Sequence, residues 1–570
     1  MRLHALVLLL QAASLASAKA ETQPPADVIY RRGVVYTVDA ARTWGETVGV
    51  SKGKIVYVGP DAGAKSWIGP GTREIDLGGK MLLPGFHDSH IHLVSGGIEL
   101  DECDLNGTTT LDQVLERVRK YAEKHPDRTW IRGGGWPLTL SGGNPHKSIL
   151  DAVVSDRPVM LAAFDGHSYW ANSKALEIAG ITKETIDPPR GRIERDPITR
   201  EPTGTVREYA SRLVNAKAPA YAHEDRVEGL RRALALAAQF GITSVQEATS
   251  GINVLNAYME LDRQNELTVK TVAAMYYSPT MPMTQLDQFV EWRQKYRGKR
   301  LRATSVKIAE DGVIESKTAA LIEPYLGGNG SERGWLNIEP EKLNSLAAEI
   351  DRRGFQIHIH AIGDLSIQAS LDALEFARKV NGVRDSRHHI AHIQLFDPPD
   401  IARFRQLGVI ANFQSLWAWA DPYIVDMTLP ILGPERSRWL YPIRSVANTG
   451  AVIVGGSDWS VTSMNPLEAI QVAVTRRGPA AEPGPAWLPE EVVDLKTMLA
   501  AYTINGAYLN FQERETGSIE VGKAADFIVL DRNLFEIPLH EIHRAKVLLT
   551  VLDGKEVFRS ADFPPSRLKD

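Results

Sequence analysis

Eight short apolar runs, separated by segments with helical periodicity, constrain the fold of this chain more than any other feature. The intervening segments, such as 231–240 and 342–353, carry a polar face, as surface helices do. Strands that alternate with helices form parallel sheets, and eight such units close into a (β/α)₈ TIM barrel with its active site at the C-terminal strand ends. The runs are 82–92, 242–247, 269–277, 303–310, 355–361, 388–394, 408–413 and 451–458. We therefore predict an α/β fold of this class.

The two ends of the chain have a different character, with short strands and turns in residues 27–80 and again around 526–552. We expect both ends to form one composite β-unit, and two unrelated β-caps are the alternative. The predicted division is a barrel over 81–510, with 21–80 and 511–570 as the two parts of the β-unit.

The stretch 101–240 is too long for one crossover between the first two barrel strands. It contains strand-like segments at 129–133 and 159–163, so we predict an insertion over the barrel mouth.

The first 20 residues form a short apolar segment that begins with Arg2 and ends in small residues. The segment is too short and too interrupted for a membrane span, which needs about 20 apolar residues. We expect a cleaved signal peptide and an exported protein, periplasmic or extracellular, with no stable membrane span after cleavage. An uncleaved anchor is the alternative.

If this signal peptide is cleaved, the mature N-terminus lies within a few residues of Lys19 or Glu21. N-terminal sequencing of the exported native protein tests the expectation, and retention of Met1 would contradict it.

The composition excludes some partners. A net charge of −5 gives no basic field, so nucleic acid is not an expected partner. The single cysteine, Cys103, cannot form an intrachain disulfide, and packing is a more common role for such a residue than nucleophilic catalysis. The expected partner is a small-molecule substrate, and the sequence leaves homo-oligomers open.

A His-x-His pair at the end of the first apolar run is the strongest chemical signal. Strand side chains alternate, so His90 and His92 share a face and can bind one metal ion. His87 has the opposite parity and should point toward the outer helices. Two histidines on a polar strand face are the simpler explanation, but the position at a barrel strand end favours a metal site.

Two further runs end in histidine. His358 and His360 share one strand face, and His360 lies nearer the C-terminal end, where a metal would sit. His358 is one layer deeper and should have a supporting or packing role. His392 ends the next run. A hydrogen-bonded structural histidine explains each of these alone, but three such strand ends together favour metal ligation.

Asp458 closes the last apolar run and is placed to ligate the metal or to take a proton from water. The alternative is an aspartate that caps the next helix.

Lys307 lies in the fourth run with the parity of the barrel interior, where a bare ammonium is costly. Carboxylation by carbon dioxide would convert it into an anion that can bridge two metal ions. A lysine paired with Glu310 or Asp311 is the alternative.

The motifs together resemble the amidohydrolase superfamily, in particular its YtcJ-like branch, which includes N-substituted formamide deformylases. The resemblance rests on PGFHDSHIHL, SVKIAEDGVIESKTAAL, HIHAIGD, HIAHIQL, GGSDWSV and GSIEVGKAADFIVLD, and it covers nearly the whole chain. It implies a (β/α)₈ barrel with a composite β-sandwich formed by both chain ends. It also implies roles for seven residues: His90, His92, His360 and His392 as metal ligands, Lys307 as a carboxylated bridge, Asp458 as the acid/base and His167 facing the substrate. Glu247 departs from the pattern, because many relatives have aspartate there.

The expected function is metal-assisted hydrolysis of a non-peptide C–N bond in an amide or formamide, with one or two divalent ions, Zn²⁺ being the expected metal. Deamination of a cyclic amidine and ester hydrolysis on the same site remain alternatives. A non-catalytic extracytoplasmic binding protein is the alternative of another class. Five tryptophans suggest an apolar or aromatic substrate group or ordinary packing: Trp136, Trp170, Trp417, Trp419 and Trp459.

Overall fold

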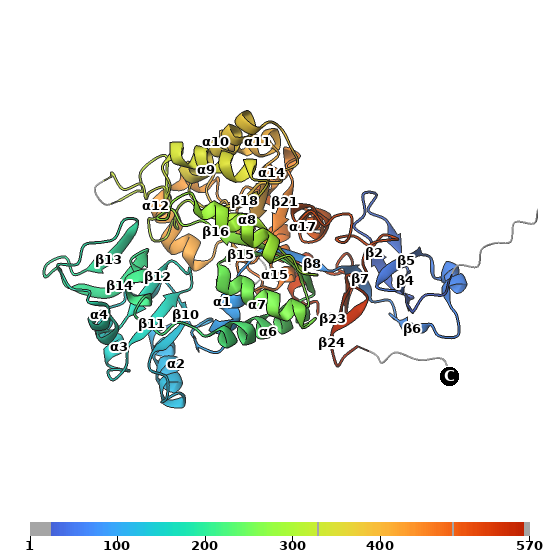
Figure 1. Ribbon diagram of the computed structural model, residues 1–570, viewed down its shortest axis with the longest axis horizontal. Helices are drawn as coiled ribbons and strands as arrows, with labels where there is room; N and C mark the ends of the chain where they lie inside the picture. Colours follow the sequence, from blue (N-terminus) through green and yellow to red (C-terminus); the bar gives the residue numbers. More distant parts are fainter. Residues whose placement is uncertain (1–23, 328–329, 481–483, 564–570) are drawn as a thin grey trace, which may run out of the picture.

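The computed structural model describes residues 24–327, 330–480 and 484–563, so the expected signal peptide lies outside the described residues. Its centre is an eight-stranded parallel sheet that curls into a nearly closed barrel (Figure 1). The barrel strands are β8 (Phe86–Ile91), β15 (Ile242–Ser250), β16 (Lys270–Tyr276), β17 (Leu301–Ala309), β18 (Gln356–Ala361), β19 (His389–His392), β20 (Ile410–Phe413) and β21 (Ile453–Gly455). The backbone N–H of Asp458 donates to the carbonyl of His90 at 2.8 Å and joins the last unit to the first. The predicted barrel is confirmed.

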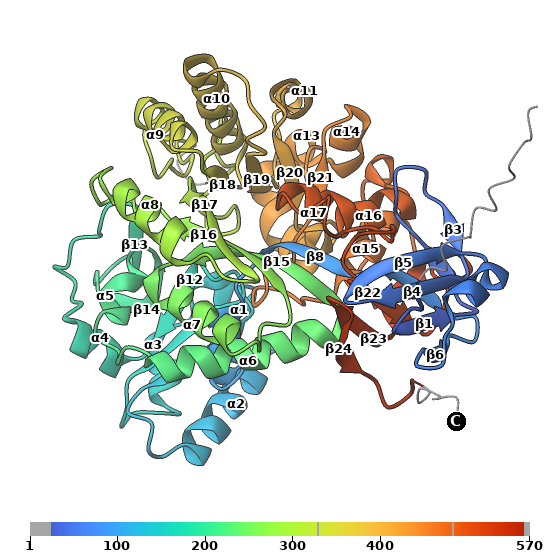
Figure 2. The same ribbon diagram turned by 45° about the vertical axis from the view of Figure 1, so that its right-hand side comes forward.

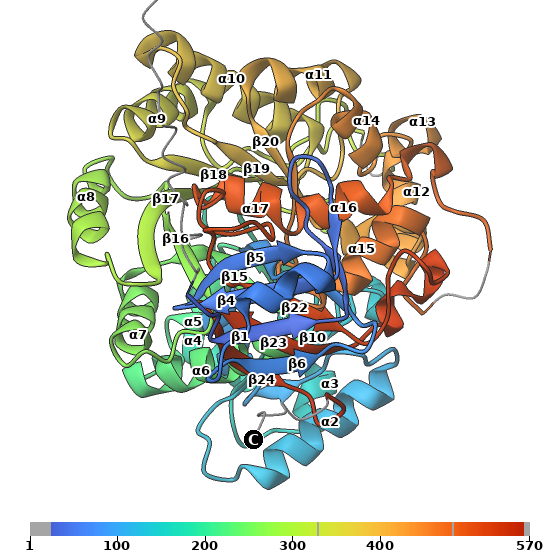
Figure 3. The same cartoon turned by 90° about the vertical axis from the view of Figure 1, so that its right-hand side faces the viewer.

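Helices surround the barrel (Figure 3). They include α1 (Leu93–Glu99), α6 (His223–Gln239), α7 (Ile252–Arg263), α8 (Gln285–Lys295), α9 (Pro340–Arg352), α10 (Asp364–Asn381), α11 (Pro398–Leu407), α14 (Ile443–Asn448), α15 (Pro466–Thr475), α16 (Leu495–Ala501) and α17 (Ile504–Leu509). Helices α1 and α6 cross at Gly97 and Gly229, where a Cβ on Gly97 would lie 1.9 Å from the Gly229 carbonyl oxygen. Glycine at this crossing allows the two backbones to touch.

Both chain ends build one β-sandwich, as the resemblance implied (Figure 2). Strand β22 (Phe527–Leu530) pairs antiparallel with β7 (Met81–Pro84), which places the C-terminal segment inside a sheet begun by the N-terminal one. The other strands are β1 (Val28–Arg31), β2 (Val34–Tyr36), β3 (Trp44–Gly45), β4 (Thr47–Ser51), β5 (Lys54–Gly59), β6 (Arg73–Asp76), β23 (Val547–Leu552) and β24 (Lys555–Arg559). Side chains from both ends, among them Tyr30 and Phe527, share one apolar core.

The first apolar run, residues 82–92, was predicted as one barrel strand, but it forms two strands that belong to two different sheets. Strand β7 belongs to the β-sandwich, and the barrel strand β8 begins only at Phe86. The break lies at Gly85, where a Cβ would come within 2.3 Å of the Thr243 side chain. The close approach of a neighbouring strand therefore requires glycine at the turn between the two sheets.

A six-stranded sheet with three short flanking helices and one longer helix lies at the opposite end of the barrel from the β-sandwich (Figure 1). Its elements are β9 (Cys103–Asp104), α2 (Leu111–Lys124), β10 (Ile131–Trp136), α3 (Lys147–Asp151), β11 (Val159–Ala163), β12 (Ser168–Ala171), α4 (Ser173–Ala179), β13 (Gly191–Arg195), β14 (Pro202–Glu208) and α5 (Ser211–Asn215). Trp136, Trp170 and Cys103 are buried in its core, so all three are packing residues. No helix within the described ranges is long and apolar enough to cross a membrane.

Candidate metal centre

His90, His92 and Asp458 come together at the C-terminal mouth of the barrel, and one ligand atom of each lies within 4.8 Å of the others. Asp458 Oδ1 is 3.2 Å from His90 Nε2 and 3.0 Å from His92 Nε2. His90 points inward from β8, and His92 follows the strand as the residue before α1. The alternation of strand side chains places both imidazoles on one side. Two imidazoles and a carboxylate are a donor set that suits a divalent ion such as Zn²⁺.

Asp458 lies three residues beyond the end of β21, in a loop, and not on the strand itself. Its φ of +54° is in the left-handed region, which aspartate adopts more readily than most residues. Burial alone would raise the pKa of Asp458, but His90 and His92 hold it well below its usual range. The following helix, α15, is capped by the Asn465 side chain, which accepts from the N–H of Leu467. Asp458 is therefore not a helix cap.

His360 and His392 face the same space from β18 and β19, with ring centroids 4.4 Å apart. His392 Nδ1 is 4.0 Å from Asp458 Oδ2 and is a buried nitrogen with no hydrogen-bond partner among the described residues. His360 Nε2 lies 3.2 Å from the carbonyl oxygen of Gly312. Both histidines adjoin the compact group of His90, His92 and Asp458 without being part of it. The unpartnered nitrogen of His392 fits a site that takes one more ligand bond.

His358 supports His90 from below, whereas His87 lies elsewhere. His358 Nε2 is 2.8 Å from His90 Nδ1, so it orients that ring from the layer below. Such a contact leaves His90 Nε2 directed at Asp458. His87 lies on the other side of β8 against α17, where a Cβ on Gly506 would approach its Cβ to 2.5 Å.

Lys307, on β17, lines the cavity at the barrel mouth into which His90 and His92 also point, and it is only 4% exposed. Burial lowers the pKa of Lys307 to about 7. No ion pair or hydrogen bond of its ammonium occurs within the described ranges. Asp311 instead accepts from the backbone N–H groups of Ala320, Ile362 and Gly363. Both carboxylate oxygens of Glu310 are buried without a partner. The alternative pairing of Lys307 with either carboxylate is therefore absent.

Glu247 lies behind His92. Its Oε1 is 4.0 Å from His92 Nδ1, and its Oε2 accepts from Tyr258 Oη at 2.7 Å and from the N–H of Leu93 at 3.0 Å. Burial raises the pKa of Glu247 to about 6. The residue that departs from the family pattern thus lies beside a candidate ligand.

His167 reaches the site from the inserted sheet, with its ring centroid 5.4 Å from that of His360. Its Nδ1 lies 3.0 Å and 3.1 Å from the two carboxylate oxygens of Glu208. Burial alone would lower the pKa of His167, but Glu208 raises it to about 9. Glu208 was not predicted as a site residue from the sequence. It ends a strand without alternating apolar and polar residues, so no local pattern distinguishes it from a surface carboxylate.

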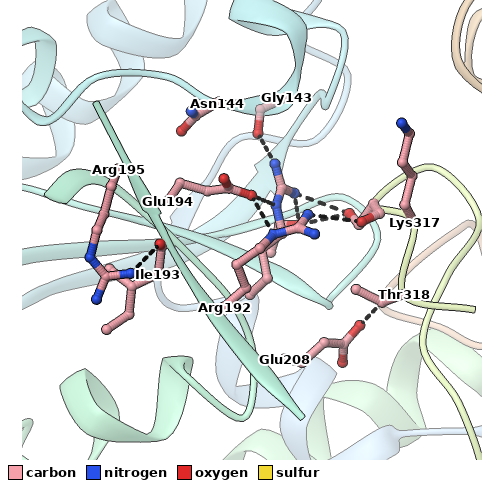
Figure 4. A network of polar contacts seen from close by, with 12 residues as sticks. Gly143, Asn144, Arg192, Ile193, Glu194, Arg195, Glu208, Lys317 and Thr318 are labelled. Atoms are coloured by element: carbon pink, nitrogen blue, oxygen red, sulfur yellow. Dashed lines mark hydrogen bonds and ion pairs between the residues drawn. The ribbon is translucent and has the colours of Figure 1, made fainter. Parts of the chain in front are cut away.

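Glu208 contacts Thr318 beside a cluster of polar contacts around Glu194 (Figure 4). Thr318, in the loop after β17, donates to Glu208 Oε1 at 2.7 Å. Arg192 and Arg207 both contact Glu194 Oε1, at 2.9 Å and 2.5 Å, and Arg207 donates to the carbonyl of Gly143. Both arginines also donate to Ser316 in the loop after β17 at 3.0 Å, so these contacts and that of Thr318 join the inserted sheet to a barrel loop and hold His167 over the barrel mouth.

Two cavities meet at these side chains. The larger, about 980 Å³, extends between the barrel and the inserted sheet and is lined by polar groups that include Glu99, Glu102 and Arg132. The smaller, about 310 Å³, is called here the aromatic pocket. Its aromatic walls are Phe164, Trp417, Trp419, Tyr423 and Tyr441. Both cavities are lined by His167, His360, His392 and Asp458. Trp459 borders only the larger one.

Comparisons with known proteins show what this chain is similar to in sequence and fold. The model of the family described as "Amidohydrolase family" matches residues 73–558. Protein LONG AFTER FAR-RED 3 of Arabidopsis thaliana is 32% identical, over 94% of this chain and 92% of its own length. N-substituted formamide deformylase of Arthrobacter pascens is 28% identical, over 93% of this chain and 97% of its own. The crystal structure of an uncharacterized metal-dependent hydrolase from Pyrococcus horikoshii OT3 covers 90% of this chain and 99% of its own, with a TM-score of 0.71 and 25% identity.

Proposed function

The chain belongs to the amidohydrolase family, and from this premise we propose that it hydrolyses the C–N bond of an amide or an N-substituted formamide. It is a metal-dependent amidohydrolase that acts on C–N bonds of a small-molecule substrate. The observation that supports hydrolysis of an amide or formamide is the approach of Asp458 to His90 and His92, within a barrel mouth that opens into two cavities. The similarity to a formamide deformylase supports the same bond type.

In this proposal His90, His92, His360 and His392 would hold the metal, which we expect to be Zn²⁺, and a carboxylated Lys307 would be the ligand for a second ion. A divalent metal held there would lower the pKa of water and polarise a carbonyl group. Asp458 accepts the proton of the attacking water and delivers it to the departing nitrogen. Its low pKa keeps the carboxylate ionised and ready to accept that proton.

We propose that His167 binds the substrate through Nε2. Glu208 engages Nδ1, and this leaves Nε2 as the nitrogen available to the two cavities. A protonated His167 has both ring nitrogens as donors, so it donates to an oxygen of the substrate. Glu208 positions the ring and stabilises its charge.

Replacement of His167 by asparagine is expected to lower kcat/KM by about tenfold to a hundredfold, mainly through KM, because a hydrogen bond from a charged donor is lost. Glu208→Gln should lower kcat/KM in the same direction by a smaller factor. Steady-state kinetics checks both. His223→Asn is the matched control, because His223 forms a similar pair with Glu260 at 2.6 Å on an exposed surface. Equal kinetics in His167→Asn and His223→Asn would contradict the assignment.

Metal analysis of the purified protein together with a hydrolysis screen tests the proposed function. Amides and N-substituted formamides are expected to be cleaved, and metal removal should abolish cleavage. Faster turnover of esters or cyclic amidines would replace the proposed bond by one of those alternatives. Tight binding of small molecules with no turnover in metal-replete protein would support the binding-protein alternative.

A further inference from the structure

The aromatic pocket has several carboxylates at its walls, among them Glu315 and Asp421, and its lining contains neither lysine nor arginine. His167, the protonated histidine of the wall, is already paired with Glu208. Neither carboxylate forms an ion pair within the described ranges of the chain. Glu315 Oε1 accepts from Thr428 Oγ1 at 2.5 Å and from Gln394 Nε2 at 3.2 Å. Asp421 Oδ1 accepts from the N–H of Ile424 at 2.7 Å. The histidines of this pocket are those it shares with the larger cavity.

Gln394 adds an independent observation. Its side chain lines the pocket and the residue is only 3% exposed, yet among the described residues its Oε1 accepts no hydrogen bond. Its Nε2 is already used by Glu315. Because no donor among the described residues uses Oε1, this amide oxygen is a free acceptor in the pocket wall beside the two carboxylates.

The electrostatics agree with this geometry. Burial and the nearby charge of Glu315 together raise the pKa of Asp421 to about 7. Burial also raises the pKa of Glu315. Both shifts show that these carboxylates lack a compensating positive charge in the protein.

The walls between these acceptors and the candidate metal centre are apolar. Trp417 stacks on the His392 ring with centroids 5.6 Å apart and planes at 4°, and Tyr423 stacks on Phe164 at 5.1 Å. Aromatic faces attract cations as well as apolar groups. A volume of about 310 Å³ is at the lower end of small-molecule sites, enough for one ring and a short side chain.

We propose that the aromatic pocket binds a cationic amine carried on an apolar or aromatic part of the substrate, with Glu315, Asp421 and Gln394 as acceptors for the ammonium group. An ammonium has three donors and no acceptor, which complements these three side chains. The inference rests on the proposed function, because the same molecule would present its scissile bond to Asp458. It adds the substrate class: amides or formamides with a positive charge at the end remote from that bond.

The test compares two compounds of equal shape. One is mono-formylated p-xylylenediamine, which carries a free aminomethyl group, and the other has a neutral hydroxymethyl group in that place. Both are measured with metal-replete enzyme for kcat/KM and, in parallel, for binding by calorimetry, at mildly alkaline pH where the aminomethyl group stays protonated. The variants are Glu315→Gln and Asp421→Asn, which keep the acceptor oxygens that Gln394 and Ile424 use. Asp426→Asn is the matched control, because Asp426 is exposed in the same segment, Tyr423–Thr428.

We expect the cationic compound to bind about tenfold to a hundredfold more tightly than the neutral one, and each of the two variants to reduce this preference. Asp426→Asn should keep it. Equal binding of the two compounds by the unaltered enzyme, or an unchanged preference when both variants are combined, would overturn the inference. If the cationic compound binds with the expected dependence on Glu315 and Asp421 but neither compound is hydrolysed, the pocket assignment stands and the proposed reaction is wrong.

Discussion

Replacement of Asp458 by asparagine is expected to lower kcat by about 10²–10⁴-fold, or more, while most of the bound metal is kept. Asparagine preserves the size of the side chain and one oxygen ligand, but its amide cannot accept a proton from water at neutral pH. Asp458 Oδ1 lies within 3.2 Å of His90 Nε2 and 3.0 Å of His92 Nε2, so an oxygen at this place still supports the ligand group. Catalysis should therefore suffer more than metal content, and both are measured on the same preparation.

A matched control separates this role from a structural one. Asp494 caps α16 through the N–H of Thr497 at 2.9 Å. Asparagine is as good a helix cap as aspartate, so Asp494→Asn should leave kcat unchanged. A metal-replete Asp458→Asn enzyme with near-native kcat would remove Asp458 from the mechanism.

Replacement of Lys307 by alanine is expected to lower both metal content and turnover, the latter by on the order of 10²-fold or more, because a bridging ligand is lost. Carboxylation requires an uncharged amine, and burial lowers the pKa of Lys307 to about 7, so much of the side chain is uncharged near neutral pH. The amine nitrogen attacks the carbon of carbon dioxide and loses a proton, which leaves a carbamate anion on Nζ. Short carboxylic acids such as acetate should restore part of the activity of Lys307→Ala, since they supply a carboxylate in the space that the side chain leaves.

Carbon NMR of protein equilibrated with ¹³C-labelled bicarbonate provides a readout that does not depend on activity. A carbamate signal is expected in the unaltered protein and not in Lys307→Ala. Lys270→Ala is the control, because Lys270 is a largely buried lysine whose ammonium pairs with Asp526 and, at 3.1 Å, with Asp553. That variant should lose stability without rescue by acids. Full activity of Lys307→Ala would rule out the bridge and favour a single ion.

The barrel and its candidate ligands could be predicted from the sequence, because both depend on local periodicity. A strand repeats every two residues, so the spacing of His90 and His92 places them on one face in any register. The same two-residue period predicted that His358 lies one layer below His360. In the structure His358 Nε2 lies 2.8 Å from His90 Nδ1. Alternating apolar runs and helices are likewise local patterns, and all the predicted barrel strands are present.

Other parts of the site had no periodic pattern. Asp458 lies in a loop with positive φ beyond β21, and its approach to His92 depends on the closure of the barrel rather than on its own strand. The break of the first run at Gly85 depends on a neighbouring strand, since only the nearby Thr243 side chain excludes a Cβ there.

The acidic residues that surround the site are the clearest case of what the tertiary structure alone decided. Glu208 comes from the inserted sheet, Glu315 from the loop after β17 and Asp421 from the segment after β20. In the sequence each resembles an ordinary surface carboxylate. Their environment is set by segments far apart in the chain, as when Thr318 donates to Glu208 and Thr428 to Glu315. Candidate metal ligands on strands can be predicted from sequence because strand geometry orients them. The side chains that we propose to select the substrate depend on loop packing, which is encoded by contacts between distant segments and not by local repetition.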